Sequence, residues 1–388
     1  MKLKGLRVLD LSLFLPGPHL TMMMADHGAE VIKLEPPGGE PVREVGLKQN
    51  QTSVWFRNTH RGKQSICINL KEQAGRDALL KLAATCDVVV EAFRPGVAGR
   101  LGMDYPAVSA VNPGIVYCSI SAFGQNGPLR DRPAHDLAVE ALSGLVACNI
   151  DGHGKPVNPH VPAADMAASL MAFSGILMAL LRRHETGKGD FIDVAMLDSL
   201  MAWTPNVTGP VFAEHRAPHP PEERSFGGNA FYRVYRTADN RYLALGGSEQ
   251  KFVVNLLTAL GREDLSSLHA QGPGPHQQPL VDYLDATFAT KTLAEWETFL
   301  ADIDVCWAPV LDLKQAFDQP QVQHRNMRWQ DADGNDHIGV PIQFANEPAC
   351  PDPVLPSIGQ HNRQVLLACG LDSATIDELE KTGVLLSS

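Results

Sequence analysis

Asp165 is the residue whose type and position most favour chemistry in this sequence. It follows a loop rich in proline and small residues and opens a long apolar segment predicted to be helical over residues 166–184. An acid in the first turn of a helix lies at the positive end of the helix dipole, beside free backbone N–H groups. We therefore expect an ionised, immobile carboxylate, with small alanines around it that let a ligand come close. The alternative is that Asp165 only caps the helix.

Two further side chains with acid–base potential stand at the starts of predicted helices. His135 lies at a loop-to-helix junction beside Asp136, and an imidazole gains or loses a proton near neutral pH. Glu249 begins the helix that follows a predicted β-hairpin at residues 231–247. Both have a structural alternative, because a single histidine is usually structural and Glu249 could simply cap its helix.

The elements that must position these residues alternate between strands and helices. Strands are predicted at residues 6–11, 31–35, 87–93, 114–124 and 191–195, and helices at residues 20–27, 72–85 and 105–111. This alternation predicts an α/β fold with a parallel sheet covered on both faces, which binds ligands in the loops at strand ends. Cations in such loops could each be a solvated surface charge, but together they indicate a pocket for an anion such as a nucleotide phosphate: Arg43, Arg61, Lys63, Arg94 and Arg100.

The first β-α-β unit, residues 6–35, invites a comparison with dinucleotide-binding folds, in which Glu35 would bind a ribose. The turn between its strand and its helix has no Gly-x-Gly-x-x-Gly pattern, and Pro16 and Pro18 stand where flexible glycines are needed. The sequence therefore argues against a bound dinucleotide.

The composition changes at residues 214–228, a stretch rich in proline and charge that we interpret as a linker. We expect residues 1–213 to form a large domain that carries Asp165. Residues 229–325 are predicted to form a smaller α+β domain that contains the hairpin. Residues 326–388 make up the remaining C-terminal segment.

Composition narrows the possible partners and the compartment. The chain has 388 residues, a net charge of −11 and no run rich in lysine and arginine. The composition therefore argues against nucleic acid as a partner, because phosphate backbones require a basic face. The seven cysteines, an odd number without a Cys-x-x-Cys pair, are interpreted as reduced thiols of a cytoplasmic protein. The apolar segment 166–181 is shorter than a membrane span, so we expect no membrane-spanning segment.

Motifs along the whole chain resemble the family III CoA-transferases, also called the CaiB/BaiF family. They occur in a fixed order: LRVLDLS with a following PGP, MMADHGAEVIKLEPPGG, NTHRGKQSI, EAFRPGVAGRLGM, SAFGQNGP, PAADMAASLMAFSGILMALLRRHETGKGDFIDVAMLDS, APVLDL and GQHNRQVL. One such motif would be a weak signal, but the ordered series covers nearly all of the chain.

The resemblance implies an acyl-CoA substrate and a fold with a Rossmann-like large domain and a small domain. It also implies a homodimer whose subunits interlock like links of a chain, with the C-terminal segment packed back on the large domain. Asp165 matches the catalytic aspartate of the family. The positions that match coenzyme A contacts, or lie in the same basic loops, are Arg43, Leu70, Lys71, Arg94 and Arg100.

Members of this family perform two kinds of chemistry on one site. In the transferases, the aspartate attacks a donor thioester, a mixed anhydride forms, and a second carboxylate finally takes over the CoA; no metal or other cofactor is needed. In the racemases, one group removes the proton α to the thioester carbonyl and another returns a proton to the opposite face. The enolate oxygen then needs N–H donors, which we expect from the helix start near Asp165 and Met166.

The motif set is closest to α-methylacyl-CoA racemase. Racemases carry a Gly-His-Asp motif, an aspartate about thirty residues later and a glutamate in a Gly-x-x-Glu-x-x-Phe motif, which match His135, Asp165 and Glu249. The sequence departs from the pattern at Ala134, which replaces the glycine before the histidine, and in the absence of a glycine run after Asp165. We therefore expect racemisation of a 2-methylacyl-CoA, with CoA transfer as the alternative and a non-catalytic CoA-binding protein as a third hypothesis.

Overall fold

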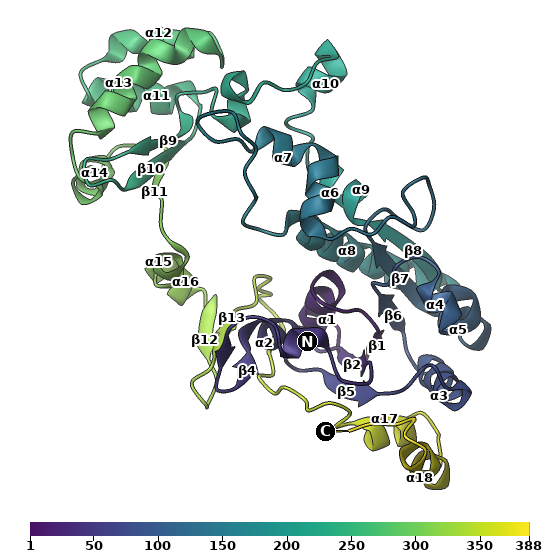
Figure 1. Ribbon diagram of the computed structural model, residues 1–388. Coiled ribbons are helices and arrows are strands. Elements are labelled where there is room, and N and C mark those ends of the chain that lie inside the picture. The colour runs from purple at the N-terminus through teal and green to yellow at the C-terminus, as the bar shows by residue number, and fades with distance from the viewer. Residues whose placement is uncertain (388) are drawn as a thin grey trace. The chain divides into compact units, whose positions relative to one another are not determined.

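The computed structural model describes residues 1–387, which form two compact units (Figure 1). The larger unit comprises residues 1–143, 160–203 and 320–387, and the smaller unit comprises residues 144–159 and 204–319. The expected linker, residues 214–228, lies within the smaller unit.

A six-stranded parallel sheet forms the centre of the larger unit, in the order β5-β2-β1-β6-β7-β8. Its strands are β1 (Arg7–Asp10), β2 (Glu30–Glu35), β5 (Gln64–Cys67), β6 (Val88–Glu91), β7 (Val116–Ser121) and β8 (Asp190–Ala195). In the central strand, Leu9 pairs with Ile32 on one side and with Val89 on the other. Nearly every residue of β1, β6 and β7 is buried, as expected for strands covered on both faces. The predicted α/β class is therefore confirmed.

Helices cover both faces of this sheet. On one face, α1 (Pro16–Asp26) packs against α8 (Ala163–Thr186) and α9 (Met196–Met201) follows β8. Alternate strand residues on the other face share a core with α3 (Gln73–Ala83), α5 (Tyr105–Val111), α17 (Asn362–Ala368) and α18 (Ser373–Lys381). The remaining elements of this unit are α2 (Val54–His60), α4 (Val97–Arg100), α6 (Asp136–Ser143), α16 (Pro320–His324), β3 (Lys48–Gln49), β4 (Thr52–Ser53), β12 (Arg328–Gln330) and β13 (Asp336–Ile338).

The helix α1 begins earlier than the sequence pattern predicts. It was expected from residue 20 but starts at Pro16, because a proline in the first helical turn loses no hydrogen bond and already has a helical φ. Gly17 allows the close approach of this turn to the preceding loop, since a Cβ at that position would lie 2.1 Å from Oγ of Ser12.

The helix α8 is also longer than expected. It has 24 residues and ends where Gly187 adopts a left-handed conformation with φ 70°. By length and apolar composition alone it could cross a membrane, which corrects our expectation that the segment is too short. A single such helix is weak evidence of a membrane span, since a core helix of a soluble protein has the same composition. Here α8 packs against α1, α9, β7 and β8.

The last residues of the chain return to the sheet of the larger unit. Ile68 forms an antiparallel bridge with Leu385, and the N–H of Asn69 donates to the carbonyl oxygen of Val384 at 2.8 Å. Val365 and Leu366 from α17 lie in the same core as the strands. The edge of the sheet at β5 is thereby covered.

The smaller unit is an α+β arrangement. Its antiparallel sheet has the order β11-β10-β9, with β9 (Tyr232–Arg236) and β10 (Tyr242–Gly246) joined as the predicted hairpin and β11 (Trp307–Pro309) added at one edge. Phe231, Tyr235, Phe288 and Trp296 form much of its core. Its helices are α7 (Leu145–Cys148), α10 (Gly209–Glu214), α11 (Gln250–Ala259), α12 (Ser266–His269), α13 (Gln278–Phe288), α14 (Leu293–Leu300) and α15 (Leu313–Phe317).

Candidate active site

Asp165 and His135 line the same cavity in the larger unit. The cavity has a volume of about 350 Å³ and lies beyond the carboxyl ends of β1, β6 and β7, where a parallel sheet binds ligands. Its walls come from the loop around Phe14 after β1, the loop around Arg94 after β6 and the residues around Ser121 at the end of β7. The fold therefore brings together two of the three candidate side chains that the sequence singled out.

Two carboxylates from α6 cap the helix that carries Asp165. Oδ1 of Asp136 accepts hydrogen bonds from the backbone N–H groups of Ala164 and Asp165, at 2.9 and 3.1 Å. Oε1 of Glu140 accepts the N–H of Ala163 at 2.8 Å. Asp165 is thus the third residue of α8 and not its cap. The acids of α6 satisfy three of the N–H groups that every helix start leaves free.

This capping contradicts the expectation that the start of α8 offers N–H donors to an enolate oxygen. The N–H of Asp165 already donates to Asp136, and the N–H of Met166 donates to the carbonyl oxygen of Pro162 at 3.0 Å. An enolate or oxyanion formed in the cavity must therefore be stabilised by other groups.

The same arrangement raises the pKa of Asp165 to about 7. Burial of the carboxyl group is the largest cause, followed by repulsion from the carboxylates of Asp136 and Glu140. The pKa of about 7 runs against the expectation of a fully ionised aspartate, because burial and the two neighbouring acids all favour the protonated form. Near neutral pH the group exists in both protonation states, which suits a side chain that takes up and releases protons.

His135 precedes α6 and is exposed at the wall of the cavity. Its carbonyl oxygen accepts the N–H groups of Ala138 and Val139 in the first turn of that helix. Its imidazole ring meets the ring of Phe14 edge-on, with the ring centroids 6.4 Å apart and the planes at 79°. The carbonyl oxygen of His135 thus accepts hydrogen bonds from the first turn of α6, while its side chain is exposed to a ligand in the cavity.

Glu249 belongs to the smaller unit. It is exposed and occupies the N-cap position of α11, but its side chain forms no capping hydrogen bond. The structure therefore does not support the alternative that Glu249 caps its helix through its side chain.

Two arginines outside the predicted set, Arg130 and Arg132, also line the cavity. Arg130 and Arg132 lie in the loop before His135, and Arg94 joins them from the loop after β6. A Cβ built on Gly96 would lie 3.5 Å from Nη1 of Arg100 and 3.8 Å from Nη2 of Arg130, so those two guanidinium groups converge on one glycine. In the sequence, Arg130 and Arg132 could have been found from the segment RDRPAH, where they stand close before His135.

A second cavity, of about 490 Å³, includes Leu70 and Lys71 in its walls. Leu13 and Phe93 line both this cavity and the cavity of Asp165. Lys71 is exposed, whereas Leu70 is buried. The two cavities are therefore neighbours within the larger unit.

Other expected anion-binding cations are neutralised inside the protein. Nη2 of Arg61 lies 2.6 Å from Oδ2 of Asp26, and Nζ of Lys63 lies 3.0 Å from Oδ2 of Asp10, with both cations buried. Arg61 and Lys63 are therefore structural, which corrects the expectation that they face an anion.

Arg43 also has an internal partner. It forms two hydrogen bonds with the carboxylate of Glu35, at 2.6 and 2.8 Å, and one with the carbonyl oxygen of Pro356 at 2.9 Å. Of the five cations that were expected in loops, Arg94 and Arg100 stay exposed.

The family model for "CoA-transferase family III" matches residues 3–362. The chain belongs to this family. It is 34% identical over 402 residues to "Succinyl-CoA:glutarate CoA-transferase" of Mus musculus, covering 99% of this chain and 90% of that protein. It is 31% identical over 402 residues to "Alpha-methylacyl-CoA racemase" of the same species, covering 100% and 98%.

Solved structures agree with this assignment. A CaiB/BaiF family protein from Brucella suis superposes with a TM-score of 0.81 at 27% identity, covering 95% of this chain and 99% of that one. Members of CoA-transferase family III act on CoA thioesters, so this protein is an acyl-CoA enzyme of either the transferase or the racemase kind. Within residues 1–387, no group of three or more His, Cys, Asp or Glu side chains is arranged to hold a metal ion.

Proposed function

We propose that this family III enzyme racemises or epimerises the α-carbon of a 2-methylacyl-CoA by a two-base proton transfer. One observation carries the proposal: His135 and Asp165 line one cavity, and the pKa of Asp165 is raised to about 7. An acid–base catalyst works best when its pKa lies near the pH at which it operates. One of the two side chains removes the proton next to the thioester carbonyl, and the other returns a proton to the opposite face.

Coenzyme A would be held by the cationic and apolar side chains around the two cavities. We assign this role to Arg43, Leu70, Lys71, Arg94 and Arg100, of which Lys71, Arg94 and Arg100 are exposed and suited to phosphate groups. The enolate that forms after proton removal carries negative charge. Because the N–H groups at the start of α8 are occupied, we assign the stabilisation of this charge to the arginines of the cavity. We also include Glu249, in the role that the racemase motif implies, which is to orient a base.

The test is exchange of the α-proton with solvent. The protein is incubated with (R)-2-methylacyl-CoA in D₂O without any added acid, and the mass at the α-position is followed. We expect deuterium uptake that is lost in His135→Gln and Asp165→Asn and retained in the exposed control variants His153→Gln and Asp264→Asn. Absence of uptake across a series of 2-methylacyl chains would refute the proposal.

CoA transfer between carboxylic acids is the second candidate, because Arg94, Arg130 and Arg132 line the cavity and suit a free carboxylate acceptor. The relatives that are named as CoA-transferases also support CoA transfer. In this reaction the carboxylate of Asp165 attacks the thioester carbonyl and CoA leaves as a thiolate. The thiolate then attacks the aspartyl carbonyl of the mixed anhydride and the donor acid leaves, so that an aspartyl-CoA thioester remains for the acceptor.

Hydroxylamine distinguishes this second candidate. It should trap an acylated Asp165 in the presence of donor acyl-CoA, and a carboxylate such as glutarate should then become CoA-linked. Transfer without α-proton exchange would establish the transferase, and exchange without transfer would establish the racemase.

We further propose an interlocked homodimer in the cytoplasm. The support is an exposed apolar face of α8, where Met178 and Leu181 are 66% and 74% exposed, more than a single chain in water would favour. All seven cysteines are free, which fits a reducing compartment. Light scattering on the purified protein should give twice the mass of one chain, and a monomer would refute the dimer.

A further inference from the structure

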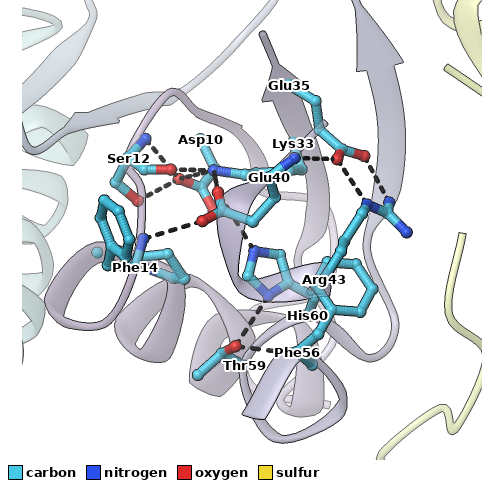
Figure 2. A network of polar contacts seen from close by, with 12 residues as sticks. Asp10, Ser12, Phe14, Lys33, Glu35, Glu40, Arg43, Phe56, Thr59 and His60 are labelled. Carbon is cyan, nitrogen blue, oxygen red and sulfur yellow. Dashed lines mark hydrogen bonds and ion pairs between the residues drawn. The ribbon is translucent and has the colours of Figure 1, made fainter. Parts of the chain in front are cut away.

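A cluster of buried charges contacts the loop between β1 and α1 (Figure 2). Asp10, Lys33, Glu40 and Lys63 each expose 3% of their surface or less. Nζ of Lys33 lies 3.0 Å from Oε2 of Glu40 and 4.0 Å from Oδ1 of Asp10, and Lys63 pairs with the other oxygen of Asp10. Burying ion pairs in this way rarely adds stability compared with apolar side chains, because desolvation offsets the attraction. Such a cluster therefore points to a role other than stability.

The cluster binds the backbone of the loop between β1 and α1. Oε1 of Glu40 accepts the N–H of Phe14 at 3.0 Å, and Lys33 donates to the carbonyl oxygen of Ser12. Asp10 accepts the N–H of Ser12 at 2.9 Å. Buried charged groups therefore hold the backbone of this loop at Ser12 and at Phe14, as Figure 2 shows.

Phe14 adopts a conformation that needs such support. Its φ is 65°, in the left-handed region that a bulky side chain rarely enters. A residue in this region costs free energy and persists only when its surroundings impose it, and such residues cluster at functional sites. Here the ring of Phe14 lines the cavity and meets the ring of His135 edge-on.

The position of Glu40 is fixed in turn. Its own N–H donates to Oε2 of Glu35 at 2.8 Å, and Glu35 is bound by Arg43. His60 lies on the other side, with Nε2 3.9 Å from Oε2 of Glu40. Burial holds the pKa of His60 well below its usual range, and Lys63 and Lys33 lower it further, so the imidazole stays neutral and Lys33 balances the charge of Glu40.

We propose that Glu40 is a positioning residue of this active site, which holds Phe14 in its left-handed conformation and thereby fixes the ring that packs against His135. Glu40 itself does not line the cavity, and it acts on the reaction through Phe14. Its kinetic test rests on the proposed function, since it uses the turnover of the enzyme.

A double-mutant cycle on kcat tests this dependence. Because small misplacements of a reacting group are costly, we expect Glu40→Ala to lower kcat about tenfold with little change in KM. Glu40→Gln keeps an acceptor oxygen for Phe14 and should recover most of the loss. In a Phe14→Ala background, Glu40→Ala should cost less than about twofold more, because residues that act as a unit are not additive. Losses that multiply would overturn the proposal.

A second measurement does not depend on catalysis. The imidazole resonances of His135, assigned with His135→Gln in protein that carries ¹³C-labelled histidine, feel the ring current of Phe14. We expect Phe14→Ala and Glu40→Ala to shift these resonances in the same direction. The control Asp26→Asn breaks a buried ion pair with Arg61 outside the cavity wall and should leave them in place.

These two measurements separate the possible failures. Unchanged His135 resonances in a folded Glu40→Ala variant overturn the positioning role, whatever the enzyme does. Shifted resonances in a protein that shows no α-proton exchange refute the racemase proposal and leave the positioning role supported. If Glu40→Ala does not fold, Glu40→Gln and Glu40→Asp serve in its place, and an unshifted His135 in both overturns the proposal.

Discussion

Replacing Asp136 by asparagine should lower the pKa of Asp165 without removing the cap of α8. The carboxylate of Asp136 binds the N–H groups of Ala164 and Asp165 through a single oxygen, Oδ1. An asparagine side chain keeps an oxygen at that place but carries no charge. The variant therefore removes one cause of the raised pKa and retains the hydrogen bonds.

The size of the effect follows from the distance between the two acids. Oδ1 of Asp136 lies 3.1 Å from the backbone nitrogen of Asp165, and we take about 6 Å as the separation of the two carboxyl groups. At that separation and an effective dielectric constant of about 40, one unit charge changes the free energy of ionisation by about 1.4 kcal/mol, or about one pKa unit. Burial is the largest cause of the shift and remains in the variant. The pKa of Asp165 should therefore fall from about 7 to about 6.

The assay is the pH dependence of kcat/KM for α-proton exchange in the direction in which Asp165 removes the proton. The acidic limb of the profile reports the pKa of the essential base in the free enzyme. We expect this limb to move down by about one pH unit in Asp136→Asn. The exposed control Asp264→Asn, which also removes one negative charge, should leave it in place. A limb that does not move, or that moves to higher pH, would refute the electrostatic reasoning.

Three further outcomes are expected. The pKa of Asp165 is raised above its unfolded value of 3.8, so its contribution to stability is fully present below pH 3.8 and is lost as the pH rises through about 7. Asp165→Asn should therefore flatten this part of the curve of unfolding free energy against pH. An unchanged slope would contradict the raised pKa. Arg100→Gln should weaken the binding of CoA, measured by calorimetry, and should reduce the dependence of that binding on salt. Equal affinity and equal salt dependence in the variant and the unsubstituted protein would exclude a phosphate contact. Gly17→Ala should destabilise the protein by about 1–3 kcal/mol in urea unfolding, since the new Cβ would overlap Ser12. A variant as stable as the unsubstituted protein would mean that this turn can move.

The strands and the long helix could be predicted because their burial follows their sequence pattern. Continuous apolar runs such as residues 88–90 identify strands buried on both faces, and α5 has the predicted bounds. The helix α2 was missed for the opposite reason. Its buried face contains Arg57 and His60, which a hydropathy pattern assigns to solvent, and their burial depends on partners far along the chain such as Asn335.

The two candidate residues that line one cavity could be named from the sequence, but their electrostatic environment could not. Asp165 and His135 could be named from motifs, because each stands at the start of a helical segment. The pKa of Asp165 depends on Asp136 and Glu140, which face the start of α8 only after α6 has docked. In the same way, the charge of Lys63 is visible in the sequence, whereas its pairing with Asp10 requires the fold.

The return of the C-terminal segment to the sheet has a consequence for synthesis on the ribosome. Residues such as Val365 and Ile376 share one core with the first strands, so this core cannot be completed until residues 365–385 have emerged. The smaller unit draws its core from residues 230–300 and can be completed earlier. The apolar surfaces of the N-terminal strands therefore stay exposed during this interval. The yield of folded enzyme should then depend on chaperones that bind these surfaces.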